Sequence, residues 1–247
     1  MDSELSEPDV SVVIPCYNEE ENIPLLAERV RSVFEGLPEY TCECLFVDDG
    51  STDGTRKVLP HLVEAGSRVR PLHLTRNMGQ SAALVAGLRE ARGEYILTLD
   101  GDLQNDPCDF PWFLELLRDY DCVCGYRAAR HDSWVRKVSS KVANAVRNWI
   151  LRDGVRDSGC GAKGLRRQCV DYVVPFNGVH RFLPALIRNA GFTIVECPVT
   201  DHPRIHGVSK YGIGGRLWRG LFDLVGVAWL RRRHVHPEIE RRAQCDA

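Results

Sequence analysis

The sequence predicts an α/β fold, with a mostly parallel sheet of the Rossmann-like type flanked by helices on both faces. The first indication is that strand patterns and helix patterns alternate from residue 10 to residue 100, which implies right-handed crossovers and parallel strands. The second is that the first strand, VSVVIP, is continuously apolar and β-branched, as in strands buried on both faces. The third is that polar clusters follow the strand ends, where such sheets bind ligands.

Each element is predicted from its own pattern of apolar residues. The stretch after the first strand has Ile23, Leu26, Val30 and Val33 at helical spacing. We expect strands at residues 10–15, 42–47, 70–75, 95–99, 121–126, 156–165 and 192–199. We expect helices at residues 20–33, 55–64, 80–91, within 127–152, 179–190 and 211–230.

Composition limits the domain organisation and the partners. With 247 residues and 44% apolar composition, the chain can bury one large core. We expect disordered tails at 1–9 and 234–247, one domain at 10–212 and an amphipathic helix at 213–233. The net charge of −2 predicts no nucleic-acid partner. The sequence has no apolar run of about twenty residues, so we expect no membrane-spanning helix in it, and we expect no secretory signal.

The ten cysteines are predicted to be reduced. None has C-x-x-C spacing, so we interpret them as small apolar core residues rather than disulfides or zinc ligands. Cys160 lies among glycines, where a position near a ligand is the alternative to a structural role.

Four polar clusters follow predicted strand ends, and together they predict a binding site. They comprise residues 17–19, 48–53, 76–79 and 100–104. Dinucleotide-binding and NTPase phosphate loops are absent, since no G-x-G-x-x-G or G-x-x-x-x-G-K-[ST] occurs. Within these clusters, Tyr17 could stack on a base or ribose and Asp49 could accept hydrogen bonds from a ligand. A capping role at the next helix is an alternative for Asp48, Ser51 and Asp53, and it is the favoured role for Ser51 and Asp53.

Asp100 and Asp102 flank Gly101 at the end of the fourth strand. Paired carboxylates there suit a hard divalent cation, which completes its shell with water and phosphate oxygens. A solvated turn is the alternative for this segment alone. Its position as the fourth cluster along one sheet edge favours a site for a metal and a diphosphate.

Two segments carry positive charge. Residues 127–152 combine seven basic residues with Val135, Val138, Val142 and Val146 at helical spacing, which suits either a solvated helix face or a surface for phosphate or anionic lipid. The final helix closes with three arginines. It suits either the headgroup plane of a membrane or packing onto the sheet or a second subunit.

The sequence resembles the family-2 glycosyltransferases of the GT-A fold. The resemblance rests on VVIPCYNEEENI, FVDDGSTDGT, RNMGQSAALVAG and LDGDLQNDP, and it extends through GYR, the basic segment, DSGCGAKGLRR and RIHGVSKYG. Within the family it is closest to the polyprenyl-phosphate sugar transferases, which include dolichol-phosphate mannose synthases and undecaprenyl-phosphate glycosyltransferases.

The resemblance implies residue roles and a peripheral membrane enzyme. The nucleoside of a UDP- or GDP-sugar would be held by Pro15, Tyr17, Glu19 and Asp49. The diphosphate and a Mg²⁺ or Mn²⁺ ion would meet Asp100, Gly101, Asp102 and Gln104. The phosphate of an undecaprenyl or dolichyl acceptor would be held by Arg127, Arg136 and Ser140, with Arg204 and Lys210 closing over the phosphates. The reaction would occur at the cytoplasmic face of a membrane, and a homodimer or a partner membrane protein is compatible with this role.

Three departures from the family pattern stand out. Gly101 replaces a usual alanine, Tyr126 replaces a small residue, and the C-terminal transmembrane helices of many relatives are missing from this sequence. We expect the turn to tolerate the glycine and the tyrosine to alter the acceptor pocket.

The predicted chemistry is inverting hexosyl transfer without a dedicated base. A phosphate monoester with a second pKa near ~6 is largely dianionic at neutral pH and attacks the anomeric carbon itself. An acceptor hydroxyl would instead need a general base, for which Asp157 is a candidate besides a loop or capping role. The rival predictions are therefore a family-2 enzyme that glycosylates a saccharide hydroxyl in envelope polysaccharide synthesis, and a non-catalytic nucleotide-sugar binding protein.

Overall fold

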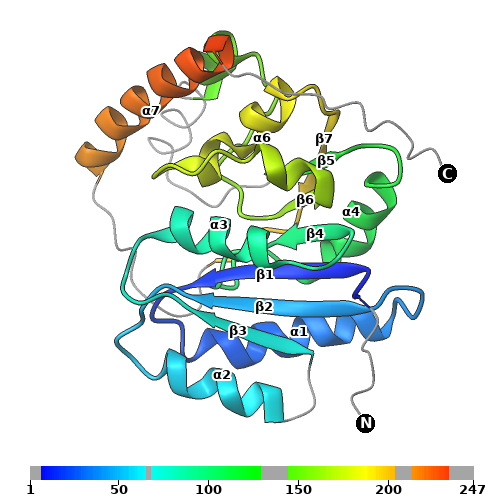
Figure 1. Cartoon of the computed structure of the whole chain (residues 1–247). Coiled ribbons are helices and arrows are strands. Elements are labelled where there is room, and N and C mark those ends of the chain that lie inside the picture. Colours follow the sequence, from blue (N-terminus) through cyan, green and yellow to red (C-terminus); the bar gives the residue numbers. More distant parts are fainter. Residues whose placement is uncertain (1–6, 65–67, 129–143, 204–212, 234–247) are drawn as a thin grey trace, which may run out of the picture.

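The computed structural model describes residues 7–64, 68–128, 144–203 and 213–233. Seven strands form one sheet in the order β3-β2-β1-β4-β6-β5-β7. All neighbouring strands pair in parallel except β6, which is antiparallel to both β4 and β5. Helices cover both faces of the sheet (Figure 1). The predicted fold class is therefore confirmed.

The bounds of the elements are as follows. The strands are β1 Val10–Cys16, β2 Cys42–Asp48, β3 Val69–His73, β4 Tyr95–Thr98, β5 Cys122–Arg127, β6 Lys163–Arg166 and β7 Ile194–Val199. The helices are α1 Asn22–Glu35, α2 Thr55–Glu64, α3 Gln80–Glu90, α4 Phe110–Leu116, α6 Val179–Asn189 and α7 Ile213–Arg233. Short 3-10 turns η1 and η2 span Pro107–Asp109 and Arg167–Tyr172, and residues 144–151 are also helical.

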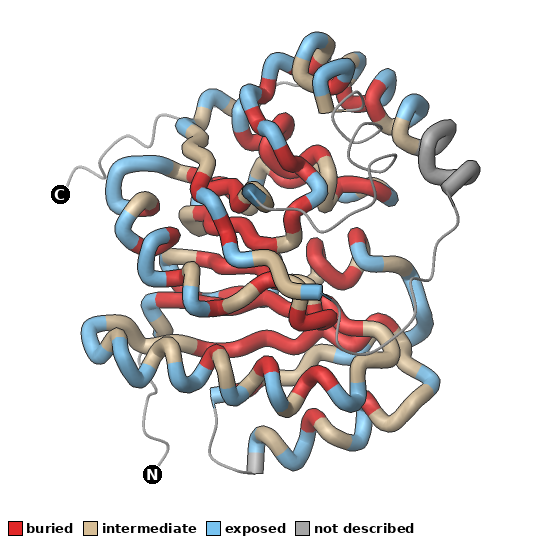
Figure 2. Tube along the Cα trace, turned by 180° about the vertical axis from the view of Figure 1, so that it is seen from behind, coloured by how far each residue is buried: buried red, intermediate tan, exposed pale blue. Residues whose placement is uncertain are grey.

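The sheet separates two apolar layers. Side chains alternate along β1, so that Val12 and Ile14 belong to one layer and Val13 to the other. The first layer packs against α1 and α4 through residues such as Phe110, and the second packs against α3, α6 and α7. Figure 2 shows buried residues concentrated in the strands and exposed residues on the outer helix surfaces. This burial on both faces explains the continuous apolar run of β1.

In the second half of the chain, one predicted strand was wrong and one helical segment was missed. The strand expected at 156–165 is a loop up to residue 162, followed by the short antiparallel β6. The loop contains Gly159 and Gly161, and the latter lies too close to Asp100 for a side chain. The helical turns from 107 to 116 were not predicted at all. They begin where Asp106 accepts a hydrogen bond from the Cys108 N–H at 3.0 Å, followed by Pro107.

The cysteines follow the prediction of a core role. All nine cysteines in the described part of the chain are free, and most are buried. Burial raises the pKa of the Cys160 thiol to about 11, so this thiol is protonated at neutral pH. Cys160 belongs to the apolar layer beneath α1 and α4, which supports its structural role.

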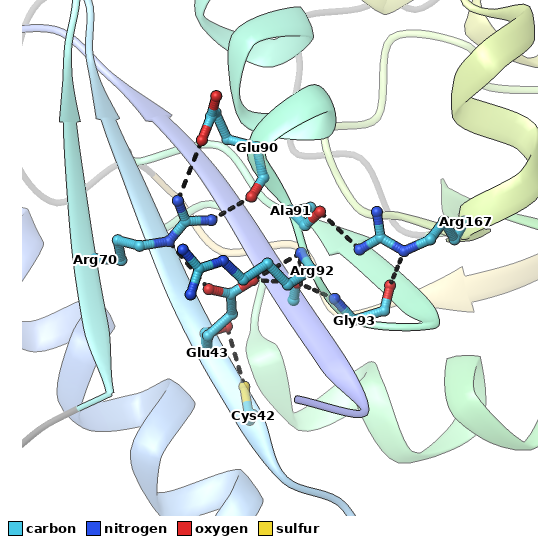
Figure 3. Close-up of polar contacts among 9 residues, drawn as sticks. Cys42, Glu43, Arg70, Glu90, Ala91, Arg92, Gly93 and Arg167 are labelled. Atoms are coloured by element: carbon cyan, nitrogen blue, oxygen red, sulfur yellow. Dashed lines mark hydrogen bonds and ion pairs between the residues drawn. The ribbon is translucent and has the colours of Figure 1, made fainter. Parts of the chain in front are cut away.

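A polar cluster braces the amino ends of the strands, where β1, β2 and the turn before β4 meet (Figure 3). Buried Glu43 accepts hydrogen bonds from Ser11 Oγ at 2.6 Å, from the Arg92 N–H at 2.8 Å and from Arg70 Nε at 3.1 Å. Arg70 also bonds the Glu90 carbonyl at the end of α3, and Arg167 donates to the carbonyls of Ala91 and Gly93. We call Ser11, Glu43, Arg70, Glu90, Arg92, Gly93 and Arg167 the amino-edge cluster.

Candidate active site at the carboxyl edge of the sheet

The loops after β1 and β2 interlock at the carboxyl edge. Asn18 adopts a left-handed conformation with φ 57° and its N–H donates to Ser51 Oγ at 2.9 Å. Its side-chain oxygen accepts from the Thr52 N–H at 2.8 Å. Half-buried Tyr17 and Glu19 flank this contact. Tyr17 and Glu19, which are predicted to bind the nucleotide sugar, therefore lie on a loop whose shape depends on contacts with the loop after β2.

Asp49 connects the second loop to the third. Its two carboxylate oxygens accept from the backbone N–H groups of Met78 at 2.7 Å and Gly79 at 2.8 Å. Gly79 has φ 92°, which favours glycine at the start of α3. Asp49 is buried, so its carboxylate orders the 78–79 turn and retains lone pairs for a further donor.

The neighbouring polar residues of the second cluster act within the protein. Asp53 accepts from the Thr55 N–H at 3.0 Å where α2 begins, in agreement with its predicted capping role. Asp48 accepts from the Ser51 N–H at 2.9 Å and contacts His73 Nδ1 at 3.1 Å.

Asp100 lies at the centre of the edge, between α3 and the loop before β6. Gln80 Nε2, in the first turn of α3, donates to Asp100 Oδ1 at 2.7 Å. A Cβ atom on Gly161 would lie 2.5 Å from the Asp100 carboxyl carbon, so only glycine lets this loop approach. Burial, and then the charge of Asp102, raise the pKa of Asp100 to about 6, against the opposing charge of Lys163.

Asp102 and Gln104 lie on a strained turn. Leu103, between them, has φ 59°, which is unusual for a leucine. Asp102 is buried and its Oδ1 accepts from the Gln104 N–H at 3.2 Å. The Gln104 carbonyl accepts from the His202 N–H at 2.8 Å, and Asn105 forms an isolated bridge with Asp201. The segment after β7 therefore holds the backbone of this turn.

Gly101 and Pro15 meet where this turn packs on the first loop. A Cβ on Gly101 would lie 3.2 Å from the Pro15 carbonyl oxygen and 3.3 Å from Cys16 Cβ. Pro15 is buried within β1, so its contribution to this edge is its backbone.

The donor set fits a metal ion that is shared with a diphosphate. No group of three or more histidine, cysteine or acidic side chains with metal-binding geometry occurs among the described residues. Two carboxylates, Asp100 and Asp102, are nevertheless close enough for one to raise the pKa of the other. Mg²⁺ commonly takes one or two protein carboxylates and obtains its remaining ligands from phosphates and water.

Arg127 and Asp157 form a paired fork at the end of β5. Arg127 Nε donates to Asp157 Oδ2 at 2.8 Å and Nη2 donates to Oδ1 at 3.0 Å. Burial opposes the charge of Arg127, but Asp157 more than compensates and raises the pKa of the guanidinium. Asp157, the candidate base, is therefore buried and bonded through both oxygens.

Several site residues were missed by sequence reasoning. Lys163 of β6 is buried, donates to the Cys160 carbonyl and lies close enough to Asp100 to lower its pKa. His180 of α6 bonds Ser81 Oγ through Nδ1 at 2.8 Å, and burial, with Arg181 and Lys163, lowers the pKa of His180 to about 3. A strand over Lys163–Arg166 would have placed Lys163 on the same sheet face as Leu165, and this was the available signal. The bounds of this strand were not found from the sequence.

Tyr126 contacts a neighbouring arginine. The Arg156 guanidinium lies over the Tyr126 ring at 3.9 Å from its centroid, and Glu196 accepts from Arg156 Nε at 2.9 Å. Four predicted acceptor residues, Arg136, Ser140, Arg204 and Lys210, lie outside the described residues.

Comparisons with known proteins place this geometry in context. The profile of the family described as "Glycosyl transferase family 2" matches residues 11–173. The chain is 39% identical over 235 residues to a dodecaprenyl-phosphate galacturonate synthase of Rhizobium johnstonii, covering 93% of the chain and 69% of that protein. It is 38% identical over 218 residues to an undecaprenyl-phosphate 4-deoxy-4-formamido-L-arabinose transferase of Sodalis glossinidius, covering 87% of the chain and 66% of that protein. The chain thus spans about two thirds of the length of these relatives.

Solved structures show the same fold at low identity. A glucosyl-3-phosphoglycerate synthase from Mycobacterium tuberculosis, in complex with Mn²⁺, UDP and its product, aligns with a TM-score of 0.64 at 18% identity, covering 91% of the chain and 80% of that protein. A mannosyltransferase from Pyrobaculum calidifontis, in complex with GDP-mannose and Mn²⁺, aligns with a TM-score of 0.58 at 19% identity. The alignment covers 94% of the chain and 66% of that protein.

Proposed function

Because the chain belongs to glycosyl transferase family 2, we propose that it transfers a hexose from a UDP- or GDP-sugar to a polyprenyl phosphate, with inversion at the anomeric carbon. Both named relatives above are transferases of this acceptor class. The association with the cytoplasmic face of a membrane belongs to the same proposal, since the acceptor is a membrane lipid. Within the described part of the chain, no helix combines the length and apolar character that crossing a membrane requires.

The donor nucleoside would occupy the three interlocked loops. Tyr17 and Glu19 flank the first loop, and Asp49 would use its remaining lone pairs for a base or ribose. The backbone of Pro15 would line this pocket. Support comes from the contact of Asn18 with Ser51 and from the contacts of Asp49 with the 78–79 turn, which join the three loops.

The diphosphate would lie over Asp100, Gly101 and Asp102. A Mg²⁺ or Mn²⁺ ion would be held by Asp100, Asp102 and Gln104, and when bound it would neutralise the leaving diphosphate. Gln80 and Gly161 fix the Asp100 carboxylate from two sides, which limits its motion before the donor arrives.

The pairing of Arg127 with Asp157 favours a phosphate acceptor over a hydroxyl acceptor. An acceptor hydroxyl would require a base, but the carboxylate considered for that role is bonded to Arg127 through both oxygens. A phosphate acceptor brings its own nucleophilic oxygen and needs positioning and charge neutralisation. Arg127 would orient this anion, with Arg136, Ser140, Arg204 and Lys210 as its further ligands.

A partition assay tests the reaction class. The purified chain is incubated with a radiolabelled nucleotide sugar, Mn²⁺ and undecaprenyl phosphate, and label is measured in the organic phase. Transfer to lipid phosphate predicts label that extracts into organic solvent and is released by mild acid. Water-soluble labelled product with an added saccharide would support the hydroxyl-acceptor alternative. Binding of donors without turnover on any acceptor would support the non-catalytic alternative.

A kinetic comparison tests the acceptor phosphate site. Arg136→Ala is expected to raise the KM for polyprenyl phosphate about tenfold or more and to change the KM for the donor little. Arg31→Ala, on exposed α1 between Glu28 and Glu35, is the matched control. An equal effect of Arg136→Ala on both substrates would contradict the assignment.

A further inference from the structure

Helix α7 has a packed face and a bare apolar face. Leu224 and Val227 are buried within the apolar layer that contains α6. On the other side Phe222 is 77% exposed, Val225 69% and Trp229 64%. Figure 1 shows α7 as the outermost element above α6. Packing onto the protein therefore accounts for only part of the apolar surface of this helix.

The helical residues 144–151, next to the end of α7, also carry exposed apolar side chains. Trp149 is 81% exposed and Val146 is 40% exposed. Arg231 near the end of α7 donates to the carbonyls of Ile150 at 3.3 Å and Leu151 at 2.8 Å. The two helices are thus joined at the ends that carry Trp149 and Trp229. We call Val146, Trp149, Leu221, Phe222, Val225 and Trp229 the outer aromatic face.

Uncompensated positive charge borders the outer aromatic face. Arg152, Arg232 and Arg233 are exposed, and none of them has an acidic partner among the described residues. The two acids of these segments are already paired. Asp153 is buried against Arg147, and Asp223 contacts Arg181 at 3.4 Å. The local charge is therefore positive although the whole chain has a net charge of −2.

We propose that the outer aromatic face docks on an anionic bilayer surface. Exposed tryptophan and phenylalanine next to arginine is the composition that binds at the headgroup boundary, where aromatic rings insert and guanidinium groups meet lipid phosphates. A second copy of the chain fits this face less well, because its arginines would be brought against their own copies. This inference needs the outer aromatic face alone, and it gives the proposed lipid acceptor a physical route to the enzyme.

Vesicle flotation tests the proposal. The full chain is mixed with phosphatidylcholine vesicles or with vesicles that contain phosphatidylglycerol, without any polyprenyl phosphate. Binding is expected only with the anionic lipid and is expected to weaken at high salt. Phe222→Ser with Trp229→Ser should weaken binding by about tenfold or more, since two exposed rings no longer insert. Arg232→Gln with Arg233→Gln should weaken it by roughly fivefold per arginine.

Trp112→Ser is the matched control. Trp112 lies on α4, is 63% exposed and belongs to the opposite face of the sheet, so this change should leave vesicle binding unaltered. Equal loss in the control, or no vesicle binding by the unaltered chain, would overturn the proposal. So would a dimer, seen by light scattering, that Phe222→Ser with Trp229→Ser dissociates.

Vesicle binding and lipid-phosphate transfer can be tested separately. Turnover of a short, detergent-solubilised polyprenyl phosphate should survive the substitutions in the outer aromatic face. If the chain used another acceptor, this turnover would be absent while vesicle binding persisted.

Discussion

The two edges of the sheet use buried polar residues in opposite ways. At the amino edge, Glu43 accepts hydrogen bonds from Ser11, Arg70 and the Arg92 N–H. Arg70 and Arg167 donate to carbonyls at the end of α3 and in the turn that follows it. At the carboxyl edge, burial and then the charge of Asp102 raise the pKa of Asp100 to about 6, against the opposing charge of Lys163. The amino edge balances its charges internally, whereas the carboxyl edge concentrates negative charge that a bound cation would relieve.

This difference separates stability from function. A satisfied buried network holds the fold, and breaking it leaves charges unpaired. At the carboxyl edge, burial of Asp100 next to a second carboxylate disfavours its charged form, which is a cost that a functional site can carry. Substitutions at the carboxyl edge should therefore change mainly the transfer rate, whereas substitutions at the amino edge should change mainly the free energy of unfolding.

The largest effect is expected at the carboxyl edge. Asp102→Asn should reduce transfer by about 100-fold or more, because a carboxylate of the proposed metal and diphosphate site is lost. The free energy of unfolding should stay within about 1 kcal/mol of the unaltered value or rise, since the repulsion with Asp100 is removed. Initial rates and urea unfolding measure the two quantities. Full transfer by this variant would remove Asp102 from the proposed site.

The amino edge should respond in the reverse manner. Glu43→Leu should lower the free energy of unfolding by about 3 kcal/mol, because Arg70 and the Arg92 N–H lose a buried acceptor. The turnover number of the folded fraction should be unchanged. Glu35→Leu, at an exposed position on α1, should change stability by less than about 0.5 kcal/mol. A selective loss of turnover in Glu43→Leu would show that the two edges are coupled.

Two glycines at the carboxyl edge test how precisely Asp100 must be positioned. In Gly161→Ala the new Cβ would lie 2.5 Å from the Asp100 carboxyl carbon, so transfer should fall about tenfold or more as the carboxylate moves. In Gly101→Ala the nearest contact would be 3.2 Å, to the Pro15 carbonyl oxygen, and neighbouring atoms need to shift only slightly. We expect transfer within about threefold of the unaltered rate. Similar kinetics for the two variants would show that Gly161 does not position Asp100.

The smallest effect concerns pH. The pKa of His180 falls from 6.5 to about 3 on folding, so between these values the unfolded chain binds a proton that the folded chain does not. Stability from this group is complete above pH 6.5 and is lost as the pH falls, by at most about 1.4 kcal/mol per pH unit. His180→Gln should flatten the stability profile between pH 6.5 and 5. His61→Gln, at an exposed histidine on α2, is the control, and urea unfolding across this range is the measurement. An unchanged slope in His180→Gln would contradict the burial of a neutral imidazole.

The sequence by itself determined the fold class, the family and the elements of the first half of the chain. Apolar periodicity is local and strong there, because β1 and β2 are buried almost throughout and helix α1 has a buried stripe that contains Ile23, Leu26 and Val30. The family motifs also lie at strand ends, so the clusters at 17–19, 48–53, 76–79 and 100–104 could be assigned to one edge. The individual roles of these residues remain predictions for the experiments above.

Only the tertiary structure decided what surrounds each site residue. Lys163 and Gly161 approach Asp100 through an antiparallel strand more than sixty positions away in the chain, and no local pattern encodes that pairing. The engagement of Asp157 by Arg127 likewise joins residues 30 positions apart. The final helix could be read from the sequence as packed or as surface-bound, and the structure assigns Leu224 and Val227 to packing and leaves Phe222 and Trp229 exposed. Periodicity specifies that a helix has faces, but only the neighbouring elements determine which face is covered.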